Sequence, residues 1–280
     1  RKFLENFSIA QICESGQCFR MEKIQDGRYQ VIAGDRYLEL EQQGNRVRFD
    51  CTEVEYRDFW RHYFDIETDY GAVMAQINPN DIYLTAAAQL AWGVRILNQD
   101  LWEMIVTFLI SQQNNIVRIR RCIKNICETY GTAKTSSNGV CYYAFPTAQA
   151  LAGLEEDALM ACNLGYRSKY VVRAAKAVSS GEMDLAWISS LNYQKARAEL
   201  LKLFGVGEKV ADCICLFALH HLDAFPVDTH IRQVMEQHYN GDSRIVVTKA
   251  FGALCSNISF ITNCMEVKNN QDKGFKECLC

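Results

Sequence analysis

Residues 203–230 read L-F-G-V-G-E-K-V-A-D-C-I-C-L-F-A-L-H-H-L-D-A-F-P-V-D-T-H and contain a glycine turn, a helix and an isolated acidic residue. Gly205 and Gly207 allow a tight turn with close backbone approach, and a helix is predicted over 207–221. The amides at the start of such a helix point outward and suit a phosphate. Lys209 lies in the first turn, where the positive end of the helix dipole disfavours an ammonium and is expected to lower its pKa. A lysine with a lowered pKa is a candidate nucleophile at neutral pH.

Two further residues of this stretch accompany the lysine. Cys213 follows Lys209 by four positions, so the two share one face of the helix. Asp228 comes shortly after Pro226 and directly before a helical pattern over 229–239, which makes it a predicted N-cap. Taken alone, Asp228 is best interpreted as a structural cap and Lys209 as a surface lysine. Together, with the glycine turn twenty residues upstream of the aspartate, they favour a functional interpretation.

The composition describes a protein with a sizeable core. The 280 residues suffice for two domains or one large one, 49% are apolar, and no stretch approaches the roughly 20 apolar residues of a membrane span. No secretory signal opens the chain, and because residue 1 is Arg we expect the native start to lie upstream. The 13 cysteines are odd in number and irregular in spacing, which favours reduced thiols in a cytoplasm and no zinc-finger metal site.

The charge is unevenly distributed. A net charge of −3 counts mildly against a nucleic-acid partner, because nucleic-acid binders are often basic. Positive charge is nevertheless concentrated in two runs. Each run alone is best interpreted as a solvated helix face, but two runs beside a phosphate-type turn favour a polyanion partner. The runs are Arg118, Arg120, Arg121 and Lys124, and then Arg167, Lys169, Arg173 and Lys176.

The predicted fold class is α+β. Residues 17–50 predict short antiparallel strands, because alternating apolar positions are separated by hairpin signals at 26–27, 34–35 and 43–45. From Asp100 onward the pattern is helical, and Asp100 with Glu103 resembles a capping box. Further helices are predicted over 115–130, 147–162, 167–180, 194–204, 207–221 and 229–239. We therefore expect a small antiparallel sheet domain over 1–98, with connecting helices, and a mainly helical domain over 99–252.

The motifs of the chain resemble those of one enzyme family. The 205–216 and 226–230 segments resemble the helix-hairpin-helix and Gly/Pro…Asp elements of the HhH-GPD base-excision DNA glycosylases. Three more segments narrow the resemblance to the 8-oxoguanine DNA glycosylase branch, over about residues 3–252. They are S-G-Q-C-F-R at 15–20, S-Q-Q-N-N-I-V-R at 111–118 and L-G-Y-R-S-K-Y at 164–170.

This resemblance implies a bifunctional glycosylase and lyase that removes 8-oxoguanine opposite cytosine in double-stranded DNA. Lys209 would attack C1′ of a nucleotide flipped out of the stack, expel the base and form a Schiff base that permits β-elimination. Asp228 would stabilise positive charge on the sugar and help to manage the proton of the lysine. The resemblance also implies a monomer in a bacterial cytoplasm, with no cofactor and no metal.

The resemblance assigns the remaining site residues by position. The base pocket would comprise Gly16, whose carbonyl would read the N7–H of 8-oxoguanine, together with Phe19 and Cys213. Contacts to the orphaned opposite base and the duplex wedge would come from Gln113, Arg118, Tyr166 and Arg167. Phosphates would be bound by Gly205, Gly207 and His230. From the residues alone, Tyr166 is equally a half-buried tyrosine at a helix start. The alternative for His230 is an ordinary first-turn histidine, although the nearby Asp228 favours a solvent-facing side chain.

Three positions depart from the family pattern. Gln113 stands where the family usually has the asparagine that fills the space beside the orphaned base. Phe204 replaces the proline usual before G-V-G, and Met21 replaces a tryptophan. The iron–sulfur cluster of a sister branch needs four closely spaced cysteines after the aspartate helix. Because the last four cysteines, beginning with Cys255, lack that spacing, we predict no cluster.

The tail over 253–280 diverges from the family. A closing helix should supply a glutamine and a stacking side chain for the base, but the chain reads A-L-C-S-N-I-S-F-I-T at 253–262. With suitable codons, reading one base earlier gives G-F-V-Q-Q-Y-L-F-Y-Y, which is the expected helix. We therefore hypothesise that residues from about 253 onward come from a frameshift.

Two alternative functions stay open from the sequence. The first is a related lysine-dependent glycosylase for another base, such as an oxidised pyrimidine; the Gly16 and Arg167 motifs argue against it. The second is a non-enzymatic DNA-binding module that uses the hairpin for phosphate contact. Lys209 paired with Asp228 argues against this module, whereas the altered tail favours it.

Overall fold

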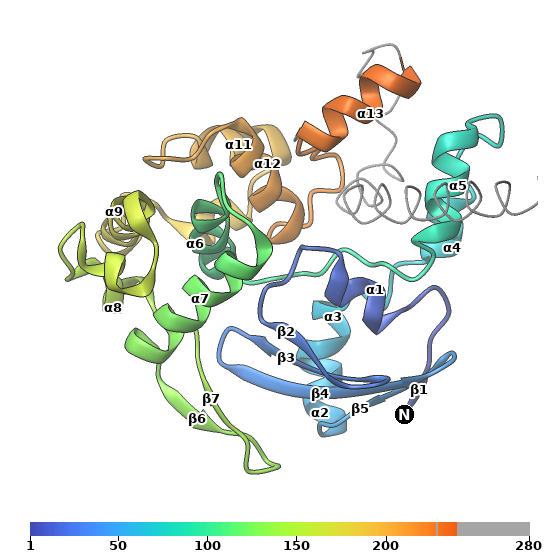
Figure 1. Cartoon of the computed structure of the whole chain (residues 1–280), viewed down its shortest axis with the longest axis horizontal. Helices are drawn as coiled ribbons and strands as arrows, with labels where there is room; N and C mark the ends of the chain where they lie inside the picture. The colour runs from blue at the N-terminus through green and yellow to red at the C-terminus, as the bar shows by residue number, and fades with distance from the viewer. Residues whose placement is uncertain (228, 240–280) are drawn as a thin grey trace, which may run out of the picture.

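The computed structural model describes residues 1–227 and 229–239, and its N-terminal part is built on a five-stranded antiparallel sheet (Figure 1). The strand order is β1-β5-β4-β3-β2. The strands are β1 (Lys2–Phe3), β2 (Met21–Gln25), β3 (Arg28–Ala33), β4 (Arg36–Gln43) and β5 (Arg46–Phe49). Along β3, Tyr29 and Val31 are buried on one face, while Gln30 and Ile32 are half-buried on the other. The antiparallel strands predicted over 17–50 are therefore confirmed.

Short helices cover the inner face of this sheet and close a first core. They are α1 (Ile9–Glu14), α2 (Glu53–Glu55), the π-helix η1 (Tyr56–Trp60) and α3 (Arg61–Tyr63). Aromatic rings fill the space between helices and sheet. Phe64 meets Phe7 and Phe49 edge-on, with ring centroids 5.9 and 5.8 Å apart. Edge-to-face pairs of this kind add to the stabilisation from burial alone.

Two helices that follow the sheet domain connect it to the last described helix, α13 (Thr229–Tyr239). They are α4 (Tyr70–Met74) and α5 (Ile82–Leu90). Leu84 of α5 belongs to a small apolar cluster with Ile231 and Val234 of α13. Figure 1 shows α13 and α5 at the same end of the molecule. The helix that follows position 228 is thus attached to the N-terminal part.

The helical part is arranged around α6 (Leu101–Ser111), whose residues 101–110 are all buried. Its other helices are α7 (Ile116–Tyr130), α8 (Ala148–Ala152), η2 (Ala158–Cys162), η3 (Gly165–Arg167), α9 (Ser168–Ser179), α10 (Leu185–Ser189), α11 (Tyr193–Leu200), α12 (Glu208–Phe217) and α13. The predicted α+β fold class, with the sheet first and the helices after it, is therefore confirmed. Within 1–227 and 229–239, no helix combines the length and the apolar character that a membrane span requires.

The single helix predicted over 147–162 is wrong. The chain forms α8, ends it with Gly153 as the C-cap, and continues as the separate 3₁₀ helix η2. Glycine is a poor helix interior residue because it loses the most backbone freedom on ordering. The break lets Leu151 and Leu159 both become fully buried.

A second hairpin, β6 (Ala133–Thr135) with β7 (Cys141–Tyr143), was not predicted. Its turn contains Gly139 at φ +78° directly after Asn138, and Asn-Gly is a hairpin signal that could have revealed it. The hairpin reaches back to the sheet. Lys134 forms a 2.6 Å ion pair with Asp35, and the Phe145 amide donates to the Gly34 carbonyl at 2.8 Å.

A buried carboxylate joins the two parts of the molecule. The Asp100 side chain caps α6 as predicted, accepting from the Glu103 amide at 2.8 Å. The Glu103 side chain does not return to the cap; it accepts from the Gly34 amide at 2.8 Å and pairs with Arg20 at 3.3 Å. Burial raises the pKa of Glu103, while Arg20 and the Gly34 amide oppose that rise. Only the Asp100 half of the predicted capping box forms, because the Glu103 carboxylate binds Gly34 and Arg20 of the N-terminal part instead.

Candidate functional site

The glycine turn forms as predicted, and its shape depends on an aromatic ring beneath it. The turn joins α11 to α12, and Gly205 has φ +90°. A Cβ atom at Gly205 would lie 2.7 Å from Cγ of Tyr170 and within 3.0 Å of two more ring atoms. Gly207 instead is exposed, has φ −94°, and has open space at its Cβ position. Only Gly205 is therefore required by the close approach of backbone to ring.

This difference makes a prediction about the two glycines. Gly205→Ala is expected to lower the free energy of unfolding by about 1–3 kcal/mol, because the new methyl overlaps Tyr170 and the positive φ is strained. It should also displace the turn. Gly207→Ala is the matched control, with a loss below about 1 kcal/mol. Urea denaturation of both variants measures this, and equal losses for the two would contradict the assigned role of the Tyr170 ring.

Lys209 is exposed at the start of α12. Gly207 is the N-cap residue of α12, and no side chain caps it. The first backbone amides of a helix have no partner within the helix, so they remain available to an anion. Lys209 thus presents its amine to solvent beside a row of amide donors. This arrangement suits an amine that acts on a phosphate-bearing substrate outside the fold.

Cys213 lies one turn after Lys209 along α12, and unlike the lysine it is buried. Its side chain is 5% exposed, and residues 210–217 of the helix are all buried. Burial raises the pKa of the neighbouring Cys215 thiol to about 12. The structure therefore brings Lys209 and Cys213 onto one helix, with the amine at the surface and the thiol in the apolar core.

The sequence interpretation missed Asp212, which fixes the orientation of α12. Asp212 is 7% exposed, and its carboxylate accepts from the Tyr193 hydroxyl and from Nε of Arg197, each at 2.7 Å. Burial and the adjacent carboxylate both raise the pKa of Tyr193. An acid inside the apolar run 210–217 was the available signal, because a buried charge needs partners. Asp212 ties α12 to α11 and so helps to position Lys209.

Asp228 lies outside the described residues, so its predicted role beside Lys209 stays a prediction. Pro226 and Val227 precede it, and α13 begins at Thr229 as predicted. His230 falls in the first turn of α13. The phosphate contact predicted for its side chain also stays a prediction.

The wedge and opposite-base candidates gather where α7 begins beside η3. Tyr166 is 48% exposed, and its hydroxyl donates to the side-chain oxygen of Gln113 at 3.4 Å. Gln113 adopts φ +46°, which is unusual for a residue with a side chain. Arg118 is exposed, and its Nη2 donates to the Asn163 carbonyl at 3.3 Å. Gln113, Arg118 and Tyr166, from the distant segments 113–118 and 166–167, therefore form one surface, with Arg167 next to them in the chain.

Arg167 is the unexpected member of this surface, because its side chain is buried and 3% exposed. Its guanidinium donates to the carbonyls of Gln112, Gln113 and Leu164 through four N–H···O contacts. An arginine side chain has five N–H donors, so these four contacts leave one N–H of Arg167 over. The structure thus shows Arg167 positioning the 112–113 turn, whereas its predicted base contact stays a prediction.

Gly16 and Phe19 lie in a segment that runs between the two parts. Gly16 has φ +77° and open space at its Cβ position. The next side chain, Gln17, is fully buried, and its amide bridges the Arg95 carbonyl and the Leu97 amide at 2.8 Å each. The two hydrogen bonds of Gln17 therefore fix the backbone next to Gly16 against residues 95–97, which connect the N-terminal and helical parts.

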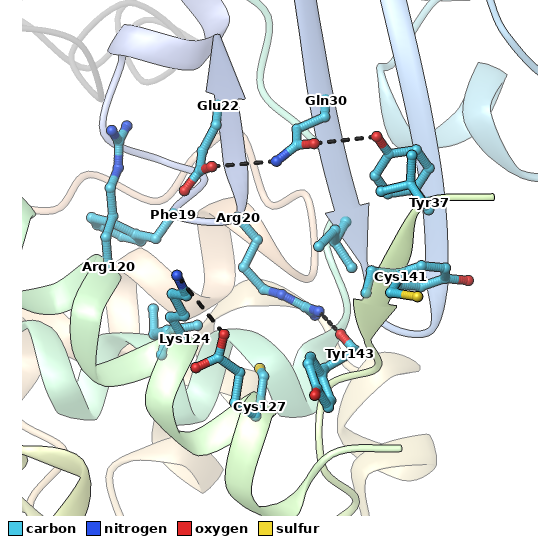
Figure 2. Close-up of a pocket in the computed structure, with 15 residues that line it drawn as sticks. Phe19, Arg20, Glu22, Gln30, Tyr37, Arg120, Lys124, Cys127, Cys141 and Tyr143 are labelled. Carbon is cyan, nitrogen blue, oxygen red and sulfur yellow. Dashed lines mark hydrogen bonds and ion pairs between the residues drawn. The ribbon is translucent and has the colours of Figure 1, made fainter. Parts of the chain in front are cut away.

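Phe19 lines a cavity of about 280 Å³ between the outer face of the sheet and α7. Figure 2 shows the Phe19 ring near Arg120, and Arg20 reaching the Tyr143 carbonyl. Gly16, Lys209 and Cys213 are not among the described residues that line this cavity. Phe19 also belongs to the same buried apolar cluster as Cys213. Its predicted place beside Cys213 in the base pocket stays a prediction.

Comparisons with known families agree with this architecture. Residues 106–256 match the model of the HhH-GPD superfamily of base excision DNA repair proteins, and residues 2–105 match the 8-oxoguanine DNA glycosylase N-terminal domain. The chain therefore belongs to the HhH-GPD superfamily of base excision DNA repair proteins. Within that superfamily, its N-terminal domain is of the 8-oxoguanine DNA glycosylase type.

Individual relatives support the same assignment. The chain is 36% identical over 158 residues to an N-glycosylase/DNA lyase of Saccharomyces cerevisiae, covering 52% of this chain and 42% of the yeast protein. It is 32% identical to a probable N-glycosylase/DNA lyase of Methanothermobacter thermautotrophicus, covering 70% and 69%. The chain thus spans less than half of the yeast relative.

A solved structure matches nearly the whole fold. The 8-oxoguanine glycosylase/lyase of Clostridium acetobutylicum, in complex with double-stranded DNA containing cytosine opposite 8-oxoguanine, is 33% identical. The superposition has a TM-score of 0.86 and covers 94% of this chain and 93% of that chain.

Proposed function

We propose that this chain is a bifunctional DNA glycosylase and lyase that removes 8-oxoguanine from double-stranded DNA, opposite cytosine. The observation that supports it most is the exposed Lys209 amine at the uncapped start of α12, next to a turn that Tyr170 holds in place. The relatives named N-glycosylase/DNA lyase, and the DNA complex of the Clostridium enzyme, support the same chemistry and the same partner.

The proposed reaction begins with a nucleotide flipped out of the duplex. Nζ of Lys209 attacks C1′ as the bond from C1′ to the base breaks, and the base leaves with a proton. Opening of the sugar ring then gives a Schiff base between Nζ and C1′. Loss of a proton from C2′ expels the 3′ phosphate by cleavage of the C3′–O bond, and water finally releases the lysine. Asp228 would stabilise the positive charge that develops on the sugar.

The proposed binding mode divides the site residues into three groups. The amides of Gly205, Gly207 and the first turn of α12 bind phosphates, assisted by His230. The Gly16 carbonyl and the side chains of Phe19 and Cys213 form part of the base pocket. Tyr166 enters the duplex, while Gln113, Arg118 and the remaining donor of Arg167 face the orphaned base. A monomer and a bacterial cytoplasmic location stay predictions.

Release of 8-oxoguanine from synthetic duplexes tests this proposal. Four duplexes each carry one 8-oxoguanine opposite a different one of the four bases. A fifth duplex carries an oxidised pyrimidine instead. We expect fastest release and strand cleavage opposite cytosine. Faster release of the pyrimidine would favour the related glycosylase. Binding of all duplexes without any release would favour the DNA-binding module.

A further inference from the structure

Phe204, at the tip of the turn before Gly205, remains unexplained by the proposed chemistry. Its side chain is 46% exposed, although it stands directly beside the phosphate-binding turn. The ring meets Tyr170 edge-on at 5.4 Å, and Tyr170 in turn meets Tyr166 edge-on at 5.8 Å. A continuous row of three aromatic rings therefore connects the proposed wedge to the tip of the turn.

Two cations from α9 lie against this row. The Arg173 guanidinium is 4.2 Å from the centre of the Phe204 ring. The Lys169 ammonium lies 6.0 Å from the same ring and 5.7 Å from that of Tyr170. An exposed aromatic ring alone is ordinary. An exposed ring flanked by cations is the composition with which proteins bind nucleic-acid strands, through stacking and phosphate contact.

Within the chain, Arg173 forms an exposed ion pair that a phosphate could replace. Glu156 accepts from Nε of Arg173 at 2.6 Å and from Nη2 at 3.1 Å. Both side chains of this pair are more than 40% exposed. Exposed ion pairs contribute little, whereas arginine binds a phosphate in the same bidentate geometry. A DNA phosphate can therefore replace Glu156 without disturbing the fold.

We propose that Phe204, Lys169 and Arg173 form a second DNA contact, which we call the cation–aromatic surface. The two cations bind adjacent phosphates, and the phenyl ring packs on the sugar or base between them. This inference rests on the proposed function, because the partner is the same DNA strand that the turn binds. Continuity supports it: Gly205 follows Phe204 directly, and both lie on the Tyr170 ring.

Salt-dependent binding to undamaged duplex DNA, followed by fluorescence anisotropy, tests the cation–aromatic surface. Arg173→Gln is expected to reduce the slope of log affinity against log salt concentration by about 0.9, the value of one lost phosphate contact. Phe204→Ala is expected to weaken binding roughly tenfold with the slope unchanged, because it removes packing and no charge. Glu156→Gln should tighten binding, since it releases Arg173. Arg57→Gln removes another exposed, ion-paired arginine, which pairs with Asp58 in η1, and should change nothing.

The outcomes separate this surface from the proposed function. Unchanged affinity and slope in both Arg173→Gln and Phe204→Ala would overturn the surface, even if the parent releases 8-oxoguanine. A parent protein that releases no base, yet shows the expected slope changes, would overturn the proposed function and leave the surface standing. Thermal unfolding of each variant confirms that the fold is intact, which is expected because the altered side chains are largely exposed.

Discussion

Lys209→Gln is expected to abolish covalent trapping and to lower base release by on the order of 10⁴-fold or more, as for the loss of a nucleophile. Borohydride reduces a Schiff base to a stable amine, so it links the parent protein covalently to a duplex that contains 8-oxoguanine. Glutamine has no amine that can attack C1′. Because Lys209 is exposed at the start of α12, the substitution should leave the fold and the binding of undamaged DNA largely unchanged.

Lys202→Gln provides the matched control for this experiment. Lys202 is also an exposed lysine beside the same turn, with its ammonium on Glu199 at 2.6 Å. It lies on the α11 side and has no helix start beside it. This variant should trap as efficiently as the parent. An adduct that persists in Lys209→Gln would assign the nucleophile to another amine and remove the central step of the proposed mechanism.

Local features of the fold could be predicted because single residues determine them. The Asp-Gly and Gly-Asp signals at 26–27 and 34–35 mark hairpins, and alternation within β3 shows which side chains are buried. Gly205 was recognised as a turn residue for the same reason. The ring of Tyr170 beneath it could not be predicted, because that contact joins segments that meet only when α9 packs beside the turn.

In the candidate site, too, contacts between segments distant in the sequence could not be predicted. The sequence resemblance identified Arg167 as a site residue, but it did not show that the guanidinium donates to the backbone carbonyls of Gln112 and Gln113. The role of Asp212 could not be predicted, because its partners Tyr193 and Arg197 come from another helix and meet it only in the folded chain. Both residues act through long-range hydrogen bonds, which no local pattern encodes.

Arg167→Met is expected to lower the free energy of unfolding by about 3 kcal/mol. The change removes a buried guanidinium and leaves the carbonyls of Gln112, Gln113 and Leu164 without its donors. Lost hydrogen bonds to a charged group cost about 1.5–3 kcal/mol each, and water can replace only part of this loss. Gln113 should then relax from φ +46°, which moves its side chain away from Tyr166. Urea denaturation measures the stability, and base release from duplexes with each opposite base measures the proposed preference for cytosine.

Arg118→Met separates positioning from contact with the base. Arg118 is exposed and donates to one backbone carbonyl, that of Asn163. Its replacement should cost less than about 1 kcal/mol of stability and still reduce the proposed preference for cytosine. If Arg167 acts by holding the 112–113 turn, Arg167→Met loses stability and preference together, whereas Arg118→Met loses preference alone. Full stability of Arg167→Met would show that the buried guanidinium is dispensable to the turn, and its role would then reduce to its one remaining donor.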